Sequence, residues 1–442
     1  MTQTPTTPHS QRLPPEQQVR QDDSLIRSAP SCADAYDPGS LGLNEARQRL
    51  LAAIKPLQGA VKRTLRATLG QVLAEDVVSP LNVPAHTNSA MDGYALQGAE
   101  LPVDAIRSFE VIGTALAGQP FDGDCQPGQC VRIMTGAIMP SGTDTVVMQE
   151  HTETDGEGRV RIGTGQRAGQ NVRQAGEDIA QGTPVLHSGR RLSAADLGLL
   201  ASLGVAEVRV RRAPRVAFFS TGDELRSIGE PLERGCIYDS NRYTLYGMLT
   251  ELGMDILDMG VVPDQPQALE QAFREAAANA DVVITSGGVS VGEADFIKPI
   301  LEQLGQINFW KLAIKPGRPL TFGHLGDALF FGLPGNPVAV MVTFRLFVEP
   351  ALRTLAGEQD WQPLLIQAIC QDSLRKKPGR TEFIRAVLEW NEQGELQVSV
   401  AGRQGSGILT SMSRANCFIV LPESNSGVAS GDRVTVQPFR QG

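Results

Sequence analysis

Three polar segments in the second half of the chain each follow an apolar run that predicts a β-strand. Ser220–Glu224 follows the first run, Asp264 the second and Ser286–Asp295 the third. Carboxyl ends of parallel strands meet at one edge of a sheet, which is where ligands bind in open α/β sheets. The N–H groups of a Ser-Gly-Gly turn also suit a phosphate group. We therefore expect a ligand to contact Ser220, Thr221, Gly222, Ser286, Gly287 and Gly288.

Charged residues of both signs accompany these turns. Glu224, Asp264 and Asp295 come from neighbouring strand ends, and carboxylates gathered in this way suit a hard cation such as Mg²⁺. Lys315 and Arg318 follow near the later strands and would neutralise an oxyanion. Each turn or charge taken alone is explained by loop geometry or by a solvated side chain. Their convergence favours a binding site.

A second group of polar, glycine-bearing turns lies in the first half of the chain. The segments are 84–95, which contains Asp92, followed by 134–137 and 171–178. Asn-Ser and Asp-Gly are turn formers, so a plain surface turn is the alternative to a functional site here. The spacing of these residues alone does not decide between the two interpretations.

The apolar periodicity divides the chain into regions of different character. A helix begins near Leu43, and short strand-like runs fill residues 81–178. From residue 213 strands alternate with helices, which is typical of parallel βαβ units. Five strand-like runs after residue 362 predict a small β-barrel or a sandwich. The predicted fold class is multidomain α/β plus β, with a central doubly wound, mostly parallel α/β domain.

These changes of pattern predict a tail and four structured regions. Residues 1–40, rich in Pro, Gln, Ser and Thr, are expected to form a disordered tail, to which we assign no role. The other regions are an N-terminal domain (41–81 and 183–213), a β-rich lobe inserted into it (82–182), the α/β domain (214–361) and a C-terminal β-barrel domain (362–442).

The composition argues against several classes of protein. Forty basic residues oppose 49 acidic ones among 442, so no global field attracts nucleic acid or an anionic membrane. No C-x-x-C or H-E-x-x-H motif occurs, so we expect no zinc site. The longest uncharged stretch, 328–344, is broken by Pro334 and Pro337 and cannot be one membrane-spanning helix. We expect a cytoplasmic protein with reduced cysteines that binds neither nucleic acid nor membrane.

Eight motifs occur in order along the chain: NSAMDGYA from Asn88, RIMTGA from Arg132, GEDI from Gly176, FSTGDEL from Phe219, IYDSNR from Ile237, TSGGVSVGEADF from Thr285, KLAIKPGRP from Lys311 and GLPGNPV from Gly332. Any single motif is unspecific, but their joint order over about residues 41–439 is highly specific. In this order the motifs resemble one family, the molybdopterin molybdenumtransferases (molybdenum insertases, including the gephyrin E-domain type).

The resemblance implies an elongated homodimer whose α/β domain is similar to the molybdopterin adenylyltransferases and faces the inserted lobe of the partner subunit. The implied enzyme inserts molybdenum from molybdate into adenylylated molybdopterin (adenylyl-molybdopterin), with Mg²⁺-dependent release of AMP, and yields molybdenum cofactor. Its implied partners are a molybdopterin adenylyltransferase and the downstream enzymes that accept the cofactor. Cationic side chains would bind the oxyanions, and Mg²⁺ on the diphosphate would disperse the developing charge.

Matched position by position, the resemblance implies roles for residues in both halves of the chain. The implied catalytic acids are Asp92, Asp178, Glu224, Asp264 and Asp295, with Asp264 and Asp295 as metal ligands. The implied substrate contacts are Thr135, Arg173, Lys311 and Lys315. A molybdate pocket between the α/β and C-terminal domains would use Lys315, Arg318, Arg385 and Ser406.

Two other functions remain open from the sequence. Adenylyl transfer from ATP to molybdopterin would use the same α/β core, although it would not need the additional lobe and terminal β-domain. A catalytically silent scaffold that holds the cofactor for delivery would need the cationic positions, although it would not need the carboxylates. The presence of Asp92, Asp264 and Asp295 argues against the scaffold.

Overall fold

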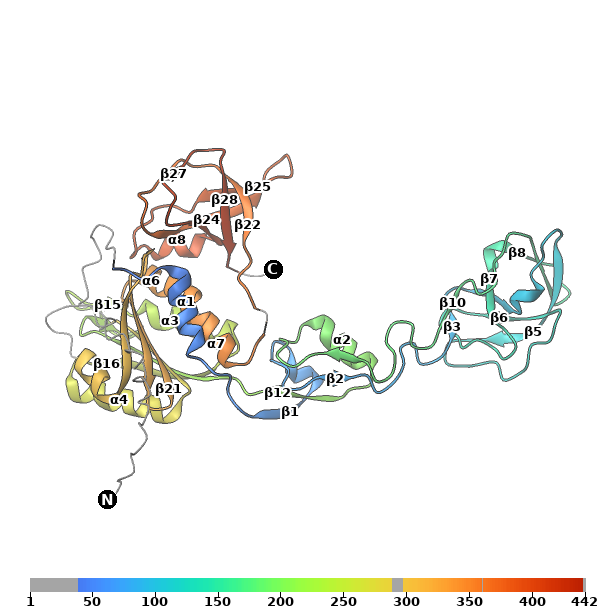
Figure 1. Cartoon of the computed structure of the whole chain (residues 1–442), viewed down its shortest axis with the longest axis horizontal. Helices are drawn as coiled ribbons and strands as arrows, with labels where there is room; N and C mark the ends of the chain where they lie inside the picture. Colours follow the sequence, from blue (N-terminus) through green and yellow to red (C-terminus); the bar gives the residue numbers. More distant parts are fainter. Residues whose placement is uncertain (1–38, 288–296, 360, 440–442) are drawn as a thin grey trace, which may run out of the picture. The chain divides into compact units, whose positions relative to one another are not determined.

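The computed structural model describes residues 39–287, 297–359 and 361–439 (Figure 1). Of the described residues, 39–55, 214–352 and 362–439 form one compact unit, and 56–213 with 353–361 form a second. Each unit contains buried apolar clusters of its own, as expected for a chain too long for one core. Two predicted site residues, Gly288 and Asp295, lie outside the described residues, as does most of the predicted tail.

The α/β domain is built on one six-stranded sheet with the order β16-β13-β17-β21-β20-β18. The first four strands pair in parallel, whereas β20 runs antiparallel to both of its neighbours. The predicted doubly wound, mostly parallel sheet is thus confirmed. The strand bounds are β13 (Arg215–Thr221), β16 (Asp255–Val262), β17 (Val282–Ser286), β18 (Gly305–Lys311), β20 (Pro319–Leu325) and β21 (Ala328–Leu333).

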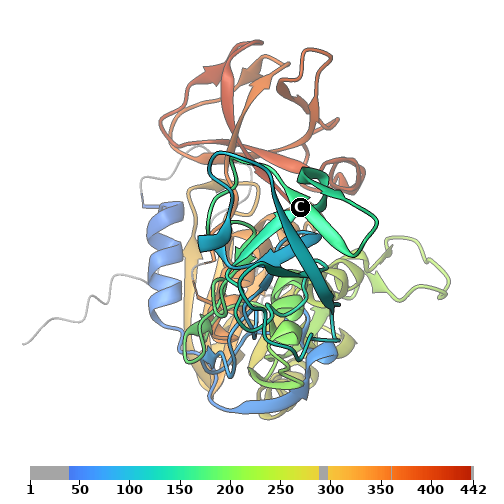
Figure 2. The same ribbon diagram turned by 90° about the vertical axis from the view of Figure 1, so that its right-hand side faces the viewer.

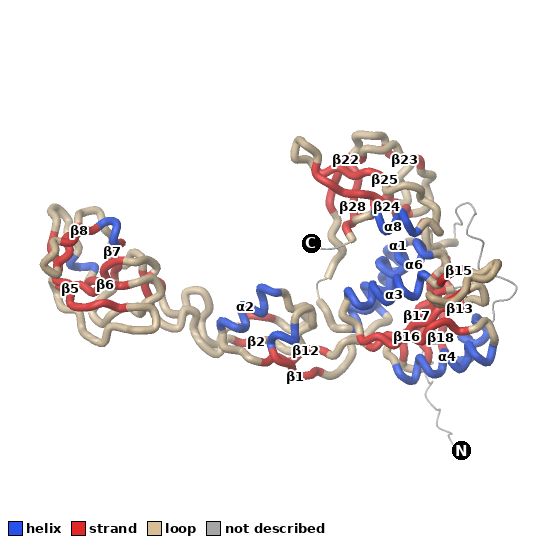
Figure 3. The backbone as a smooth tube through the Cα atoms, turned by 180° about the vertical axis from the view of Figure 1, so that it is seen from behind, coloured by secondary structure: helices blue, strands red, loops and turns tan. Residues whose placement is uncertain are grey.

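Helices cover both faces of this sheet (Figures 1 and 3). On one face Phe273 of α4 meets Phe219 and Phe330 of the sheet edge to face, at ring distances of 5.2 and 5.7 Å. Strand β17 is buried over its whole length, because a strand covered on both faces has no solvent side. The helix bounds are α3 (Ser240–Glu251), α4 (Pro266–Asn279), α5 (Ile297–Leu304), α6 (Pro337–Thr343) and α7 (Glu349–Leu355), with a π-helical turn (Phe344–Val348) between α6 and α7.

The C-terminal domain is a closed barrel of five strands, which decides between the two predicted β-architectures. The strand order is β24-β25-β22-β28-β26, and β26 pairs again with β24 to close the barrel. A short strand of the α/β domain, β19 (Ile314–Lys315), adds to β24 in parallel. The bounds are β22 (Ile366–Cys370), β24 (Thr381–Trp390), β25 (Leu396–Val400), β26 (Cys417–Leu421) and β28 (Arg433–Pro438), with β23 (Leu374–Arg375), β27 (Gly427–Val428) and helix α8 (Leu409–Arg414).

The second unit contains a small N-terminal domain and the inserted lobe. In the domain, β1 pairs with β12, and β2 pairs with β11 where the chain leaves for the lobe and returns. Ser193 and Asp196 form a reciprocal capping box at the start of α2. These elements are β1 (Ala60–Thr64), β2 (Val77–Val78), β11 (Pro184–Leu186), α2 (Ala194–Ser202) and β12 (Glu207–Arg211).

The lobe is a six-stranded sheet of mostly antiparallel strands in the order β7-β4-β6-β5-β9-β8, and Figure 2 shows these strands as teal to green arrows. A separate two-stranded pair, β3 with β10, holds two of the predicted polar turns together. The bounds are β3 (Asn88–Ser89), β4 (Gly93–Leu96), β5 (Arg107–Ala115), β6 (Gln129–Ile133), β7 (Thr145–Met148), β8 (Thr152–Thr154), β9 (Arg159–Ile162) and β10 (Val172–Arg173).

Two segments group differently from the predicted domain boundaries. Helix α1 (Leu43–Ala52) belongs to the unit of the α/β domain, because Arg47 Nε donates to the carbonyl of Leu346 at 3.2 Å. Residues 353–361 belong to the second unit, where Glu358 accepts from Arg191 at 3.0 Å and from Arg353 at 2.9 Å. Sequence periodicity identifies such helices, whereas their packing partners depend on contacts between residues far apart in the chain.

Two expectations about the whole chain can be compared with the described residues. None of the helices in these residues has the length and apolar character needed to cross a membrane. All five cysteines that the structure describes are free thiols, four of them buried. Burial raises the pKa of Cys130 and of Cys417 to about 12, so both thiols stay protonated and pack as small apolar side chains.

Candidate functional site

Hydroxyl and glycine positions line the edge where β13 and β17 end. The hydroxyl oxygens of Ser220 and Ser286 lie 3.3 Å apart, and both side chains are buried. Gly287 has a φ of +92°, and a Cβ there would lie 2.7 Å from the carbonyl oxygen of Thr221. Only glycine allows the two strand ends to approach so closely. The N–H of Gly287 already donates to the carbonyl of Leu333 at 3.2 Å, so this residue contributes the shape of the turn rather than a free N–H.

Carboxyl groups gather where β13 and β16 end. The backbone N–H of Asp264 donates to Oδ1 of Asp223 at 3.3 Å, and Gly222 brings Glu224 back against the same turn. Partial burial, followed by the charges of Asp223 and Glu224, raises the pKa of Asp264 above its usual value. A carboxyl group in this state is suited to exchange a proton or to bind a cation.

The predicted Mg²⁺ site is only partly within the described residues. Asp264 is described, whereas its predicted partner Asp295 is not. In the part of the chain that the structure describes, no three His, Cys, Asp or Glu side chains form a complete metal site. Crowded carboxylates nevertheless suit Mg²⁺, which takes one or two protein carboxylates and completes its shell with phosphate oxygens and water.

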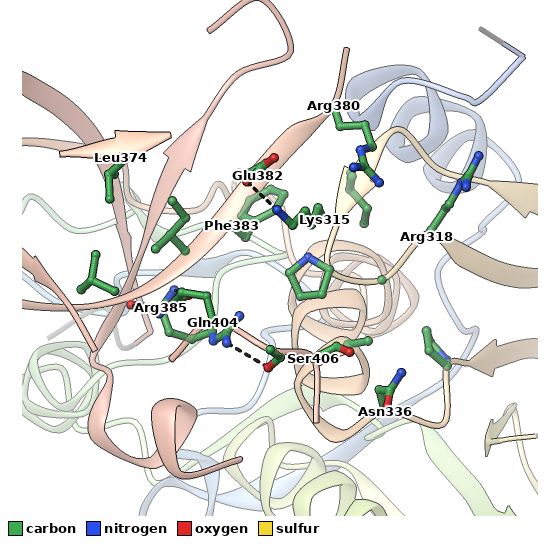
Figure 4. A pocket seen from close by; sticks show the side chains of 18 of the residues that line it. Lys315, Arg318, Asn336, Leu374, Arg380, Glu382, Phe383, Arg385, Gln404 and Ser406 are labelled. Atoms are coloured by element: carbon green, nitrogen blue, oxygen red, sulfur yellow. Dashed lines mark hydrogen bonds and ion pairs between the residues drawn. The ribbon is translucent and has the colours of Figure 1, made fainter. Parts of the chain in front are cut away.

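A cavity of about 600 Å³ lies between the loops of the α/β domain and strand β24 of the barrel (Figure 4). Side chains of both signs line it, but cations are in excess. The positive charge of these side chains exceeds the charge of a tetrahedral dianion, so the cavity could neutralise such a ligand fully. The charged lining residues are Lys315, Arg318, Arg375, Arg380, Arg385 and Glu382.

Arg385 is the most deeply buried charge of this cavity, with 1 % of its surface exposed. Its Nε donates to Ser411 Oγ at 3.1 Å, and one NH₂ group donates to the carbonyls of Arg403 and Gly405 at 3.2 and 3.0 Å. All of these acceptors are neutral, and burial lowers the pKa of Arg385 to about 10. The guanidinium stays charged at neutral pH without a carboxylate partner among the described residues, so a bound anion would supply the missing charge.

Lys315 and Arg318 approach the cavity from the α/β domain on one sharp turn. Gly317 has a φ of +98°, and a Cβ there would lie 2.5 Å from Oγ1 of Thr343, so the turn requires glycine. Lys315 Nζ lies 3.2 Å from Oε2 of Glu382 on the barrel strand, as drawn in Figure 4. Arg318 is 7 % exposed, which places a second cation against the cavity wall.

Two further predicted residues take defined places near this turn. Lys311 is the last residue of β18 and lies opposite Pro319, so it reaches the same sheet edge as Arg318. Ser406 lines the cavity, and its carbonyl accepts from the N–H of Val338 at 3.1 Å, which fixes the barrel loop against the start of α6.

The predicted residues of the first half of the chain occupy the lobe. Oδ1 of Asp92 accepts from the backbone N–H and the hydroxyl of Thr135 at 2.7 and 2.8 Å. These bonds, with a smaller effect of the Arg132 charge, lower the pKa of Asp92. Arg173 lies opposite Asn88 in the β3–β10 pair. Asp178 lies further along, where its N–H donates to the carbonyl of Val83 at 3.0 Å, so backbone pairing rather than side-chain contact explains its place.

The structure therefore brings the predicted residues together in three groups. Glu224 and Asp264 meet at the sheet edge, Lys315, Arg318, Arg385 and Ser406 line the cavity, and Asp92 and Thr135 bond within the lobe. Sequence reasoning did not single out Asp223, Arg375, Arg380 or Glu382. Asp223 lies inside a predicted segment. Arg380 directly precedes β24, and Glu382 lies on β24, the strand that bears Arg385. Their closeness in the sequence to residues already selected was the available signal.

Three family models match consecutive parts of this chain. Residues 41–204 match the MoeA N-terminal region (domain I and II), residues 217–354 a domain described as a probable molybdopterin binding domain, and residues 367–439 the MoeA C-terminal region (domain IV). The first range covers helix α1 and most of the lobe-bearing unit, the second covers the α/β domain, and the third covers the barrel.

Curated relatives and solved structures agree with these matches. A molybdopterin molybdenumtransferase of Haemophilus influenzae is 44 % identical over 90 % of this chain and 98 % of its own length. Gephyrin of Dictyostelium discoideum is 35 % identical over 84 % of this chain and 58 % of its own length. A solved molybdopterin biosynthesis moeA protein of Pyrococcus horikoshii OT3 superposes with a TM-score of 0.79 at 29 % identity, covering 90 % of this chain and all of that one.

The α/β domain with its polar strand ends and the barrel that completes a cationic cavity define a multidomain protein whose cavity suits an anionic ligand. The chain belongs to the molybdopterin molybdenumtransferase family, a family of transferases in molybdenum cofactor biosynthesis.

Proposed function

We propose that this enzyme inserts molybdenum from molybdate into adenylylated molybdopterin and releases AMP in a Mg²⁺-dependent reaction. The observation that carries the proposal is the cavity around Arg385. Its guanidinium is buried, charged and bonded only to neutral acceptors among the described residues, and Lys315 and Arg318 add positive charge beside it. An oxyanion of compact shape and double charge satisfies these groups better than any neutral ligand.

The proposed reaction assigns different tasks to the two parts of this compact unit. The cavity would hold molybdate through Lys315, Arg318, Arg385 and Ser406. The sheet edge would hold the diphosphate of adenylylated molybdopterin, with Lys311 as a further cationic contact. When bound at Asp264, Mg²⁺ would neutralise the charge that develops on the diphosphate. Asp264 and Asp295 would hold the metal, and Glu224 would keep the site acidic.

The proposal extends to the oligomeric state and to the lobe. We propose that the enzyme works as a homodimer whose lobe residues Asp92, Thr135, Arg173 and Asp178 take part in the same reaction. Their support is the hydrogen-bonded Asp92–Thr135 pair, which presents an ionised carboxylate on a rigid turn. We further propose that a molybdopterin adenylyltransferase supplies the substrate and that molybdenum-dependent enzymes accept the product, in the cytoplasm.

The test is AMP release from adenylylated molybdopterin and Mg²⁺, measured with and without molybdate. We expect AMP only when molybdate is present. A parallel reaction with ATP, Mg²⁺ and molybdopterin distinguishes the alternative activity, because adenylylated product formed there would identify an adenylyltransferase instead.

An arginine variant tests the cavity within the same assay. Arg385→Gln removes the buried charge, and we expect the molybdate concentration for half-maximal AMP release to rise at least about tenfold, the effect of losing a charged hydrogen-bond donor. Arg414→Gln, at the exposed end of α8, is the matched control. Unchanged molybdate dependence in Arg385→Gln would remove the cavity from the mechanism.

A further inference from the structure

Two buried side chains at the start of α3 have hydrogen-bonding capacity that the fold does not use. Asp239 is 3 % exposed and Asn241 is 8 % exposed. Oδ1 of Asp239 accepts from the N–H of Arg242 at 3.1 Å and caps the helix, and Nδ2 of Asn241 donates to the carbonyl of Gly335 at 2.7 Å. The second oxygen of each side chain, Asp239 Oδ2 and Asn241 Oδ1, has no hydrogen-bond partner among the described residues.

Both residues lie at the ligand edge of the sheet. Helix α3 connects β13 to β16, so it begins on the side where β13 ends. The segment before it is bound to the acidic turn, because Ile237 donates to the carbonyl of Glu224 at 2.8 Å. Asn241 is bound to the Gly335 loop, and a Cβ on Gly335 would lie 3.8 Å from Cα of Gly287. The two unused oxygens therefore border the same edge as Glu224 and Gly287.

The chemistry of these atoms determines what they can bind. Both are acceptors, and an acceptor buried without a donor destabilises the fold unless a ligand or water completes it. A phosphate group is excluded as the partner, because its oxygens are also acceptors and Asp239 adds like charge. The positive end of the α3 dipole is already engaged by the capping oxygen of Asp239. A ligand that donates through O–H or N–H groups would satisfy both acceptors.

We propose that Asp239 and Asn241 accept hydrogen bonds from the ribose hydroxyl groups of the adenylyl moiety. This inference rests on the proposed function, which brings an adenylylated substrate to this edge. In dinucleotide-binding doubly wound α/β folds, an acidic side chain likewise binds a ribose hydroxyl near the phosphate-binding edge. The IYDSNR segment thereby gains a role in substrate recognition in addition to capping α3.

The experiment compares binding of AMP and 2′,3′-dideoxy-AMP to the full chain by titration calorimetry. We expect AMP to bind the unaltered enzyme about tenfold more tightly, because a site built for hydroxyl donors rejects a ligand that lacks them. Asp239→Ser keeps a good helix cap but deletes the unused oxygen, so we expect its preference to fall below about threefold. Ser240→Ala, on the neighbouring residue, is the matched control and should keep the full preference.

Two results would overturn the inference. One is equal binding of the two nucleotides by the unaltered enzyme, a comparison that needs no variant. The other is a full tenfold preference in Asp239→Ser with a native thermal unfolding profile. Either result leaves molybdate-dependent AMP release from adenylylated molybdopterin in place. Failure of the proposed function would instead appear as an unaltered enzyme that releases no AMP.

Discussion

The sheet edge and the lobe each contain a predicted catalytic aspartate, but the surroundings shift the pKa of the two aspartates in opposite directions. Asp264 is half-buried beside Asp223 and Glu224, and its pKa is raised. Asp92 accepts two hydrogen bonds from Thr135, and its pKa is lowered. The crowded carboxylate of Asp264 is stabilised when it binds a cation or a proton. The hydrogen bonds from Thr135 instead keep the carboxylate of Asp92 ionised. The difference supports the metal-binding role that we propose for Asp264, and for Asp92 we propose an orienting role instead.

The largest expected effect is on Asp264. Asp264→Asn should reduce molybdate-dependent AMP release by about 10² to 10⁴-fold, the usual range for losing an acid–base or metal-binding group. Asp255→Asn, at the opposite end of β16, is the matched control because its carboxylate pairs with Arg215 at the surface. Turnover of Asp264→Asn close to that of the control would contradict the assigned role.

The same variant should stabilise the fold at neutral pH. A raised pKa means that the folded state holds its proton more tightly than the unfolded state, so the stabilising contribution of Asp264 is lost as pH rises through its folded pKa. Asparagine does not ionise, so the variant does not lose this stabilisation as the pH rises. The melting temperature of Asp264→Asn should exceed that of the unaltered enzyme at pH 7. The difference should vanish at about pH 3, where the carboxyl group of Asp264 is largely protonated in the folded and in the unfolded state.

Mixing two inactive variants tests whether the two regions act together across a homodimer. If the lobe of one subunit serves the sheet edge of the other, a dimer of Asp92→Asn with Asp264→Asn contains one intact site. Random exchange should then restore about a quarter of the original AMP release, since half of the dimers are mixed and each has one of two sites. Absence of any recovery, with subunit exchange verified by mass spectrometry, would place both residues in one subunit's site.

The smallest expected effect concerns Thr135. Thr135→Ala removes the hydroxyl bond to Asp92 but keeps the backbone bond, so the pKa of Asp92 should rise towards its ordinary value, as followed by carboxyl NMR. AMP release should fall only several-fold, as expected for one hydrogen bond. Thr135→Ser keeps the hydroxyl and should restore both values. A titration unaffected by Thr135→Ala would show that the backbone bond alone sets the pKa.

Much of the fold followed from local patterns. The alternation of strands and helices after residue 213 and the five barrel strands after residue 362 occur as predicted, because strong periodicity and flanking turn residues define such elements. The antiparallel strand β18 was not predicted, since an edge strand of mixed composition lacks a clear pattern. Closure of the barrel depends on the β24–β26 pairing, which joins segments far apart in the chain.

The sequence by itself determined the residue types that this chemistry requires and the order of the motifs, because both are properties of the chain. Only the tertiary structure decided which of those residues have a shifted pKa. Burial without a carboxylate partner sets the state of Arg385, and neighbouring carboxylates set that of Asp264. The unused oxygens of Asp239 and Asn241 likewise emerge only when every buried hydrogen bond is assigned. Desolvation and charge proximity act through space, so no pattern along the chain can contain them.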